Sequence, residues 1–186
     1  MRVIGGKFRS RRLKTFAGTR LRPTSDPLRE TLFNVLGASI VGATFADCYA
    51  GSGAVGIEAL SRGAAKVFFL ENYRPAAALI RGNLISLGVF NGYEILPTDV
   101  LGGLEQLERR PVRCHFIFLD PPYDAANEYA RTLTWLGARA LLAADGLVIA
   151  EHARRIPLPA SVGALERVRE LRQGDSRLSF YRCPRA

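Results

Sequence analysis

The sequence predicts an α/β domain built on an open, mostly parallel sheet, with an antiparallel hairpin at its C-terminal end and a small basic hairpin at its N-terminal end. Three observations predict this fold. Short apolar strands alternate with helical segments from residue 44 onward, a glycine-rich turn follows the first of these strands, and two β-like segments close the chain. Alternating strands and helices form parallel βα units, so the turns that could bind a ligand should gather at the carboxyl edge of the sheet.

Length and composition fit one ordinary globular unit. The 186 residues are 48% hydrophobic, and a domain of this size buries roughly 70% of the surface that its unfolded chain exposes. The three cysteines, Cys48, Cys114 and Cys183, lack C-x-x-C spacing, so we expect neither a disulfide framework nor a zinc site. No apolar run reaches the roughly 20 residues of a membrane span. We therefore expect a cytoplasmic protein without membrane attachment or metal, and take a monomer as the default.

Basic residues are concentrated at the N-terminus. Residues 1–22 hold eight Lys or Arg and no acid, whereas the remaining eighteen basic residues nearly balance seventeen acids. A basic arm on a nearly neutral body is typical of a polyanion binder, because neutralised phosphates release counterions. Its glycines and interspersed apolar residues favour a short hairpin over a solvated tail or a transit peptide. We predict an RNA-binding arm over residues 1–22, distinct from a catalytic domain over residues 23–186. Its predicted RNA-binding residues are Lys7, Arg9, Arg11, Arg12, Lys14, Arg20 and Arg22.

The first helix of the body is expected to begin near Asp26. The Asp26 side chain can cap free N–H groups, and Pro27 suits the first helical position. The apolar residues that share one face of this helix are Leu28, Leu32, Val35 and Leu36.

The alternating part of the chain then follows. Strands are expected over residues 44–49, 65–71, 93–97, 113–120 and 146–151. Helices are expected near residues 54–62, 75–87, 100–110 and 125–142. Two closing strands, near residues 165–172 and 177–183, are expected to pair as an antiparallel hairpin at the edge of the sheet.

The turn after the first strand has G-x-G-x-x-G spacing. Glycines let the backbone turn tightly and approach a ligand at the N-terminus of the next helix. By itself this spacing fits a nicotinamide cofactor, an adenosyl cofactor or a mere tight turn. The residues expected to contact a cofactor here are Asp47, Ala50, Gly51, Ser52 and Gly53.

Acidic residues follow the next two strands. Glu71 lies about twenty residues past the glycines, where a carboxylate can accept both ribose hydroxyls of a nucleoside. Asp99 could accept from an adenine amino group, or it could cap the helix that begins at Val100. Asn72 and Val100 complete the predicted cofactor contacts. No Gly-Lys-Ser/Thr loop occurs, so a nucleoside triphosphate is not expected.

The segment Asp120-Pro121-Pro122-Tyr123 ends an apolar strand. Its prolines fix φ and lack N–H donors, so the loop is stiff and its carbonyls can face a ligand. Asp120 and the Pro121 carbonyl can accept the two hydrogens of an exocyclic amino group while Tyr123 stacks on the base. An ordinary strand-to-helix turn is the alternative interpretation. With a nucleoside-containing cofactor, this loop predicts an S-adenosylmethionine-dependent methyltransferase whose catalytic residues are Asp120, Pro121, Pro122 and Tyr123. Of the two histidines, His115 is expected to be a satisfied strand residue, and His152 stays a candidate for lining the site.

Several blocks of the chain resemble the bacterial guanine-N2 methyltransferases of small-subunit (16S) ribosomal RNA, which are class I S-adenosylmethionine-dependent enzymes. The blocks are residues 1–9, 21–26, 29–34, 50–53, 58–64 and 120–123. The resemblance implies a Rossmann-like sheet and methyl transfer to guanine N2, with S-adenosylhomocysteine as product. It also implies ribosomal RNA or the small subunit as partner, in an assembled or nearly assembled 30S particle. By resemblance, residues 51–53 cradle the methionine part, Glu71 holds the ribose and Asp99 contacts adenine.

The sequence departs from that family's pattern at three places. Tyr49 stands where Phe is usual, and Leu28 where a basic residue is common. Residues 173–176, Gln-Gly-Asp-Ser, stand where related chains usually carry a basic and aromatic turn, which argues against a C-terminal contact to RNA but not against the predicted cofactor site.

Three other functions remain open from the residues. A DNA adenine-N6 methyltransferase would use the same Asp-Pro-Pro-Tyr loop, but the small region outside the sheet leaves little room for reading a DNA sequence. A nicotinamide-dependent reductase would use the glycine turn and Glu71 and leave Asp120-Pro121-Pro122-Tyr123 without a role. A non-catalytic RNA-binding assembly protein would keep the cofactor site without methyl transfer.

Overall fold

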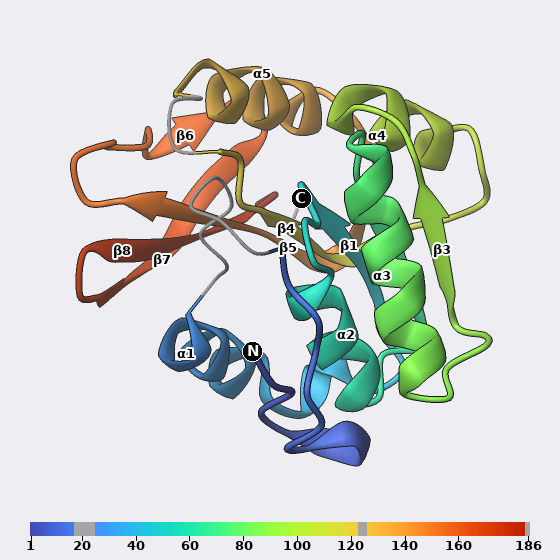
Figure 1. Cartoon of the computed structure of the whole chain (residues 1–186). Helices are drawn as coiled ribbons and strands as arrows, with labels where there is room; N and C mark the ends of the chain where they lie inside the picture. The colour runs from blue at the N-terminus through green and yellow to red at the C-terminus, as the bar shows by residue number, and fades with distance from the viewer. Residues whose placement is uncertain (17–24, 123–125, 185–186) are drawn as a thin grey trace.

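A computed structural model describes residues 1–16, 25–122 and 126–184, and in it the chain forms one eight-stranded sheet with helices on both faces (Figure 1). The strand order is β3-β2-β1-β4-β5-β8-β7-β6. The first five strands pair in parallel, and the last three add antiparallel pairings. The predicted fold class is confirmed.

The parallel strands and their helices follow the expected alternation. The strands are β1 (Thr44–Cys48), β2 (Lys66–Leu70), β3 (Tyr93–Leu96), β4 (Cys114–Leu119) and β5 (Leu142–Ala153). The helices are α1 (Asp26–Leu36), α2 (Ala54–Ser61), α3 (Arg74–Ser86), α4 (Val100–Glu108) and α5 (Ala126–Gly137), with short 3-10 turns at Gly6–Phe8 and Gly37–Ile40. No helix among the described residues is both long and apolar enough to cross a membrane.

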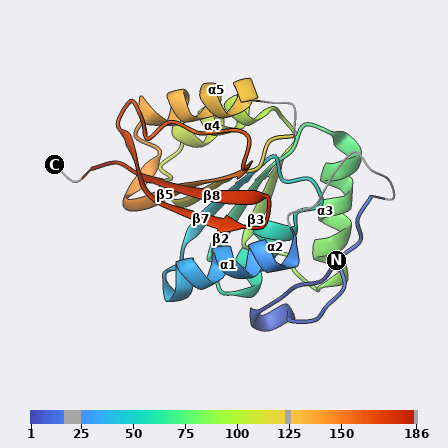
Figure 2. The same cartoon turned by 90° about the vertical axis from the view of Figure 1, so that its left-hand side faces the viewer.

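Two hydrophobic cores cover the two faces of the sheet. Helices α1, α2 and α3 cover one face, where Phe45 and Phe116 lie, and helices α4 and α5 cover the other, where Ala46 and Ile117 lie (Figure 2). Successive strand residues point to opposite faces, so a strand buried on both sides is apolar throughout. The apolar runs that predicted the central strands have this cause.

Helix α1 begins as expected, although its cap differs. Leu28, Leu32 and Leu36 are buried, as their shared face predicts. Ser25 is the residue before the first turn, and no side chain caps the helix. The Asp26 carboxylate instead accepts from Arg29 Nη2 at 2.6 Å, so the predicted cap was wrong because a buried arginine competes for the same carboxylate.

The predicted antiparallel C-terminal hairpin is confirmed, with one further short strand beyond it at the edge of the sheet. Strand β8 (Ser176–Arg182) lies between β5 and β7 (Leu165–Gln173), and the two-residue strand β6 (Ser161–Val162) forms the edge.

Helix α5 ends at Gly137 and not near residue 142. Gly137 leaves no room for a side chain beside the Val162 carbonyl, and its own carbonyl accepts from Ala164 N, so the β6–β7 turn packs on the end of the helix. The residues after it start β5 earlier than predicted, at Leu142, which pairs with Cys114.

The N-terminal arm, residues 1–16 of the described chain, packs on α2. An antiparallel bridge joins Arg2 and Arg12, and backbone hydrogen bonds join Val3 to Arg11 and Met1 to Leu13, so the expected short hairpin forms around a 3-10 turn. Val3 and Leu13 are buried and belong to the same hydrophobic core as the buried residues of α1 and α2. Arg20 and Arg22 of the predicted arm lie outside the described residues.

A buried carboxylate fixes the arm. Glu58 on α2 is fully buried, and its two oxygens accept from Ile4 N and Gly5 N at 2.8 Å each. Arg62 Nε lies 2.7 Å from the same carboxylate, and the buried Arg29 guanidinium lies 3.9 Å from it. Buried charges are tolerated when they are paired and hydrogen-bonded. The arm backbone is therefore part of the fold, while most of its basic side chains point away.

Candidate functional site

Four acidic residues lie at the carboxyl ends of adjacent parallel strands. Asp47 lies near the end of β1. Glu71 directly follows β2, and Asp120 directly follows β4. Asp99 lies just beyond the end of β3. Strand β1 pairs with β2 on one side and with β4 on the other, so the chain reverses its direction of winding at β1. Open α/β sheets bind ligands outside the strand ends at such a switch point. The fold brings the glycine turn and the Asp120 loop to neighbouring strand ends.

Asp47 holds the first turn of α2. Its carboxylate is buried, and its Oδ2 accepts from Gly56 N at 2.8 Å. Burial raises the pKa of Asp47 well above its ordinary value, and the negative charges of Asp120 and Glu71 raise it further. Gly56 has no space for a side chain, because a Cβ there would lie 2.3 Å from the Phe69 ring. The third glycine of the motif therefore packs the helix against β2.

The glycine turn has the backbone shape that its sequence predicts. Gly51 and Gly53 have φ values of +55° and +76°, and Tyr49 before them has +63°. Positive φ values suit glycine and are uncommon elsewhere. A Cβ on Gly53 would meet Ile80 at 3.1 Å, so this turn is also closely packed. Ala50 is buried, and its N–H donates to Leu70 O at 3.1 Å.

Glu71 spans the turns after β1 and β2. Its Oε2 accepts from Gly51 N at 2.8 Å, and its Oε1 accepts from Tyr73 N at 2.8 Å. A carboxylate has about four acceptor positions, so two backbone donors orient it and still leave acceptor capacity. The half-buried Glu71 is held where it could also accept from ribose hydroxyls, and Asn72 beside it is exposed.

Asp99 caps α4. Its Oδ1 accepts from Gly102 N at 2.9 Å, and Val100 is the buried first residue of the helix. The capping role that the sequence left open is therefore present. Asp99 is exposed at the carboxyl edge of the sheet, where a ligand could reach it. Its contact with adenine stays a prediction.

Asn83 was not identified from the sequence. This fully buried residue of α3 accepts from Lys14 N at 2.8 Å, and its Nδ2 donates to Lys14 O at 3.0 Å and to Ser52 O at 3.1 Å. It therefore connects the arm to the glycine turn. Its signal in the sequence is a polar residue beside Leu84, on the helix face where Ile80 is also buried.

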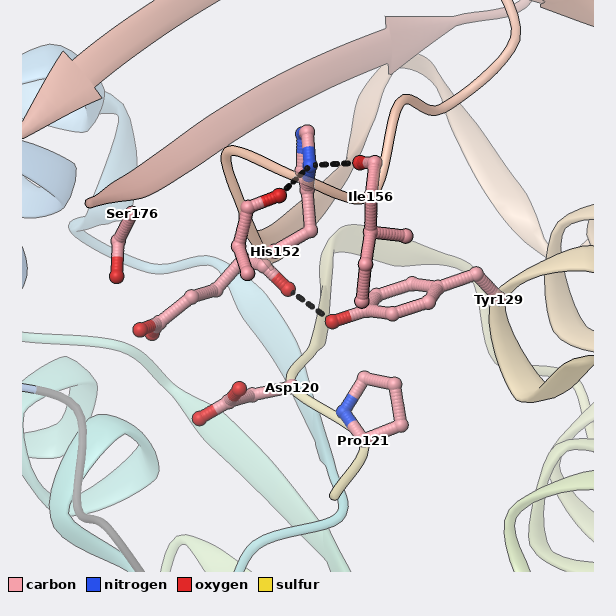
Figure 3. A pocket seen from close by; sticks show the side chains of 8 residues that line it. Asp120, Pro121, Tyr129, His152, Ile156 and Ser176 are labelled. Carbon is pink, nitrogen blue, oxygen red and sulfur yellow. Dashed lines mark hydrogen bonds between the residues drawn. The ribbon is translucent and has the colours of Figure 1, made fainter. Parts of the chain in front are cut away.

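The Asp120 loop is backed by a small cavity (Figure 3). Asp120 is half-buried, Pro121 is buried and Pro122 is exposed, while Tyr123 lies outside the described residues. The cavity has a volume of about 10 Å³, which is space for roughly one water molecule. It is lined by Asp120, Pro121, Tyr129, Glu151, His152, Ala153, Ile156 and Ser176. Tyr129 Oη donates to Glu151 O at 2.6 Å and so ties α5 to the end of β5 next to this loop.

The two histidines are both hydrogen-bonded. His115 Nδ1 accepts from Thr44 N at 3.0 Å, which confirms it as a satisfied strand residue. His152 is buried beside the cavity, and its Nδ1 donates to Ile156 O at 2.8 Å. Its Nε2 then accepts from Ser179 Oγ at 2.9 Å. Burial lowers the pKa of His152, so the neutral imidazole holds the turn after β5.

The described basic residues of the arm are exposed. They are Arg2, Lys7, Arg9, Arg11, Arg12 and Lys14, and all but Arg2 are among the predicted RNA-binding residues. The Arg11 guanidinium also donates to Ser86 O at 3.1 Å. The Phe16 ring lies 5.9 Å from the Tyr73 ring, so this end of the arm lies beside the turn that follows Glu71. Within the described part of the chain, no group of three metal-binding side chains occurs.

Comparison with known proteins assigns the family. The family model described as conserved hypothetical protein 95 matches residues 1–182. A Bacillus subtilis candidate rRNA methyltransferase, YlbH, is 36% identical over 98% of both chains, and the ribosomal RNA small subunit methyltransferase D of Escherichia coli K12 is 36% identical over 86% of this chain and 78% of its own. The solved structure of yhhF, a candidate methyltransferase of Escherichia coli, is 31% identical and superposes with a TM-score of 0.83 over 97% of this chain and 96% of its own. The chain therefore belongs to the conserved hypothetical protein 95 family, a class I methyltransferase family that includes the small-subunit ribosomal RNA methyltransferases D.

Proposed function

We propose that this protein transfers a methyl group from S-adenosylmethionine to the exocyclic N2 of a guanine in 16S ribosomal RNA, within an assembled or nearly assembled small subunit. The observation that carries the proposal is the switch-point arrangement, in which the glycine turn with Glu71 and the Asp120-Pro121 loop follow neighbouring strands. The names of the curated relatives support ribosomal RNA as the substrate class. The proposal includes action in the cytoplasm, as a monomer and without a metal.

The residues of the cofactor side fit an adenosyl cofactor. The Gly51 and Gly53 backbones bend tightly next to Glu71, whose carboxylate is oriented by two N–H donors. Glu71 would hold the ribose, residues 51–53 the methionine part, and Asp99 with Val100 the adenine. S-adenosylmethionine supplies an electrophilic methyl group when it is bound. A solved RNA methyltransferase from Salinibacter ruber in complex with S-adenosylhomocysteine has the same fold with a TM-score of 0.64, at 14% identity.

The acceptor side fits an amino group. Asp120 and the Pro121 carbonyl would accept the two N2 hydrogens of guanine, which turns the nitrogen lone pair toward the methyl carbon. The nitrogen would take the methyl group as its bond to sulfur breaks, and the Asp120 carboxylate would accept the proton that the nitrogen then loses. The base would be extruded from its stack, and Tyr123 would stack on it. Orientation of the two reactants can supply about 7–11 kcal/mol of the barrier reduction.

The basic arm would hold the RNA beside this site. Its exposed residues Lys7, Arg9, Arg11, Arg12 and Lys14 lie on a backbone that Glu58 and Asn83 fix to the domain. Arg20 and Arg22 belong to the same proposed arm. We treat residues 1–22 as the RNA-binding arm and residues 23–186 as the catalytic domain.

One labelling experiment tests the proposal. The protein is incubated with methyl-labelled S-adenosylmethionine and, separately, with 16S ribosomal RNA, small subunits and DNA, and the labelled nucleoside is identified. We expect N2-methylguanosine in the small subunit. N6-methyladenine in DNA would favour the DNA enzyme instead, and the absence of label would favour a non-catalytic assembly protein. Calorimetry with nicotinamide cofactors tests the reductase, for which we expect no binding.

A further inference from the structure

Three exposed arginines lie at the carboxyl edge of the sheet, beyond the arm. Arg154 and Arg155 follow β5, and Arg172 lies near the end of β7. Because β8 runs antiparallel to β5, with Ala153 opposite Ser176, the β7–β8 turn returns to this same edge. Arg154 N–H donates to Asp175 O at 2.8 Å, which joins the two turns directly. We call Arg154, Arg155 and Arg172 the acceptor rim.

The acceptor rim borders the Asp120 loop. Ala153 and Ser176, which adjoin the rim in the chain and in the sheet, line the same small cavity as Asp120 and Pro121 (Figure 3). The arm lies on the other side of the site, where it contacts α2 and α3. The catalytic loop therefore lies between two separate basic surfaces.

The rim arginines keep their charge available. Arg167 and Arg177 on β7 and β8 are committed to Glu170, at 3.2 Å and 2.7 Å. The three rim arginines form no ion pair among the described residues. The β7–β8 turn contributes one acid, Asp175, so the three rim arginines and this acid together carry a net positive charge. Free guanidinium groups bind phosphate oxygens in a bidentate manner.

The turn that carries Arg154 and Arg155 is held in one shape. Ile156 N donates to Ala153 O at 2.9 Å, and the buried His152 Nδ1 donates to Ile156 O at 2.8 Å. Ser179 Oγ fixes the other ring nitrogen of His152 at 2.9 Å. The backbone of the rim is thus positioned before any ligand binds, which lowers the entropy cost of binding.

We propose that the acceptor rim binds the RNA phosphates next to the methylated guanosine, on the side of the site opposite the arm. This inference rests on the proposed function, since it takes RNA as the substrate. Extrusion of a base costs unstacking energy, and contacts to the phosphates that flank the nucleotide can offset that cost. Contacts to phosphates fix register and orientation without reading sequence, and exposed arginines suit that role.

The test replaces the three rim arginines in the full-length protein, as Arg154→Gln, Arg155→Gln and Arg172→Gln together. Affinity for 16S ribosomal RNA is measured over a series of salt concentrations, together with kcat/KM on small subunits and cofactor affinity. Three lost phosphate contacts should reduce the salt slope by about 2 to 3. We expect at least a tenfold loss of kcat/KM, with cofactor affinity unchanged within about twofold.

The control removes three exposed arginines from the opposite edge, as Arg109→Gln, Arg113→Gln and Arg139→Gln, of which Arg109 and Arg139 also pair with Glu105 and Glu108. It should leave the salt slope unchanged. An unchanged slope in the rim variant, or an equal fall in both variants, would overturn the inference. The single variant Arg172→Gln should reduce the salt slope by about 1. Because Arg172 lies outside the turn after β5, this variant shows the effect of a lost arginine even if the triple variant distorts that turn. Failure of the unaltered protein to methylate RNA would overturn the proposed function. The difference in salt slope between the unaltered protein and the rim variant would still test whether the rim binds RNA.

Discussion

The cofactor side and the acceptor side of the site are stabilised in opposite ways. On the cofactor side, the acids that would contact the ligand also accept backbone N–H groups, and Glu71 and Asp99 both do so. On the acceptor side, buried side chains donate to backbone carbonyls, as Tyr129 does to Glu151 and His152 to Ile156. Those donors lie behind the Asp120 loop. They are not the groups proposed to contact the amino nitrogen.

This difference predicts two kinds of mutational effect. Removal of a cofactor-side acid takes away a proposed ligand contact and a support of the turn at once, so cofactor binding and local structure should fail together. The acceptor side separates the two roles, since Asp120 is proposed to contact the substrate while His152 supports the turn beside it. Chemistry and support should therefore be separable there.

The largest effect is expected for Asp120→Ala. Loss of the proposed amino-group acceptor should lower kcat by about 10³-fold, the range of a positioned acid–base or electrostatic group. Cofactor affinity should stay within a few-fold, because the glycine turn and Glu71 are unaltered. Single-turnover methylation of small subunits and calorimetry with S-adenosylhomocysteine measure the two quantities. Strong residual methylation would contradict the role of Asp120, and a parallel loss of cofactor affinity would contradict the separation.

The next effect is expected for Glu71→Ala. The carboxylate accepts from Gly51 and Tyr73 and would accept from the ribose, so cofactor affinity should fall by about 30-fold, equivalent to about 2 kcal/mol. Calorimetry measures the affinity. The control is Glu94→Ala, which removes another partly buried acid. Glu94 lies on β3 and pairs with Arg110 at 2.9 Å, and its loss should leave cofactor affinity unchanged. Equal affinity in Glu71→Ala and the unaltered protein would contradict both the ribose contact and the support of the cofactor turn by Glu71.

The strand ends of the site could be predicted because they follow from local pattern. An apolar strand, a glycine turn and an acid that follows a strand are all visible in the sequence, and the parallel sheet then brings them to one edge. Glu71 and Asp120 were found in this way. The position of β8 between β5 and β7 could not be found, because strand order depends on pairing between distant segments.

Buried polar residues were the other part that the sequence did not predict. Glu58 and Asn83 have polar side chains, which normally favour exposure, yet both are fully buried. Their partners are backbone groups of the arm, more than fifty residues earlier in the chain. No local periodicity encodes such partners. The packing of the arm and its connection to Ser52 therefore could not be predicted from the sequence.

A smaller effect is expected for Asn83→Ala, which tests whether the arm belongs to the cofactor side. The variant leaves Ser52 O and both backbone groups of Lys14 without their buried partner, at a cost of about 1–3 kcal/mol in the free energy of unfolding. Cofactor affinity should fall about fivefold, and trypsin should cleave the arm faster. Denaturant unfolding, calorimetry and timed proteolysis measure these changes. Asn91→Ala, at an exposed position, is the control. Faster cleavage with unchanged cofactor affinity would show that the arm and the glycine turn are independent.

The smallest effect is expected for His152, and it concerns stability alone. Burial lowers the pKa of His152 in the folded state below its ordinary value of 6.5, so the folded protein binds fewer protons than the unfolded chain as the pH falls below that value. The stability linked to the neutral ring is fully present above pH 6.5 and is lost as the pH falls through the folded-state pKa. His152→Gln removes this titration, so its free energy of unfolding should fall less between pH 7.5 and pH 5 than that of the unaltered protein.

Denaturant unfolding at the two pH values measures that difference, and effects of all other groups cancel in the comparison. The variant should keep kcat at pH 7.5 within about threefold, since His152 donates to Ile156 O and is not proposed to contact the amino nitrogen. An equal loss of stability in both proteins would show that the ring does not titrate as its burial implies. A loss of kcat comparable with that of Asp120→Ala would contradict the separation of chemistry from support on the acceptor side. On both sides of the site, the same residues would then contact the ligand and support the turn.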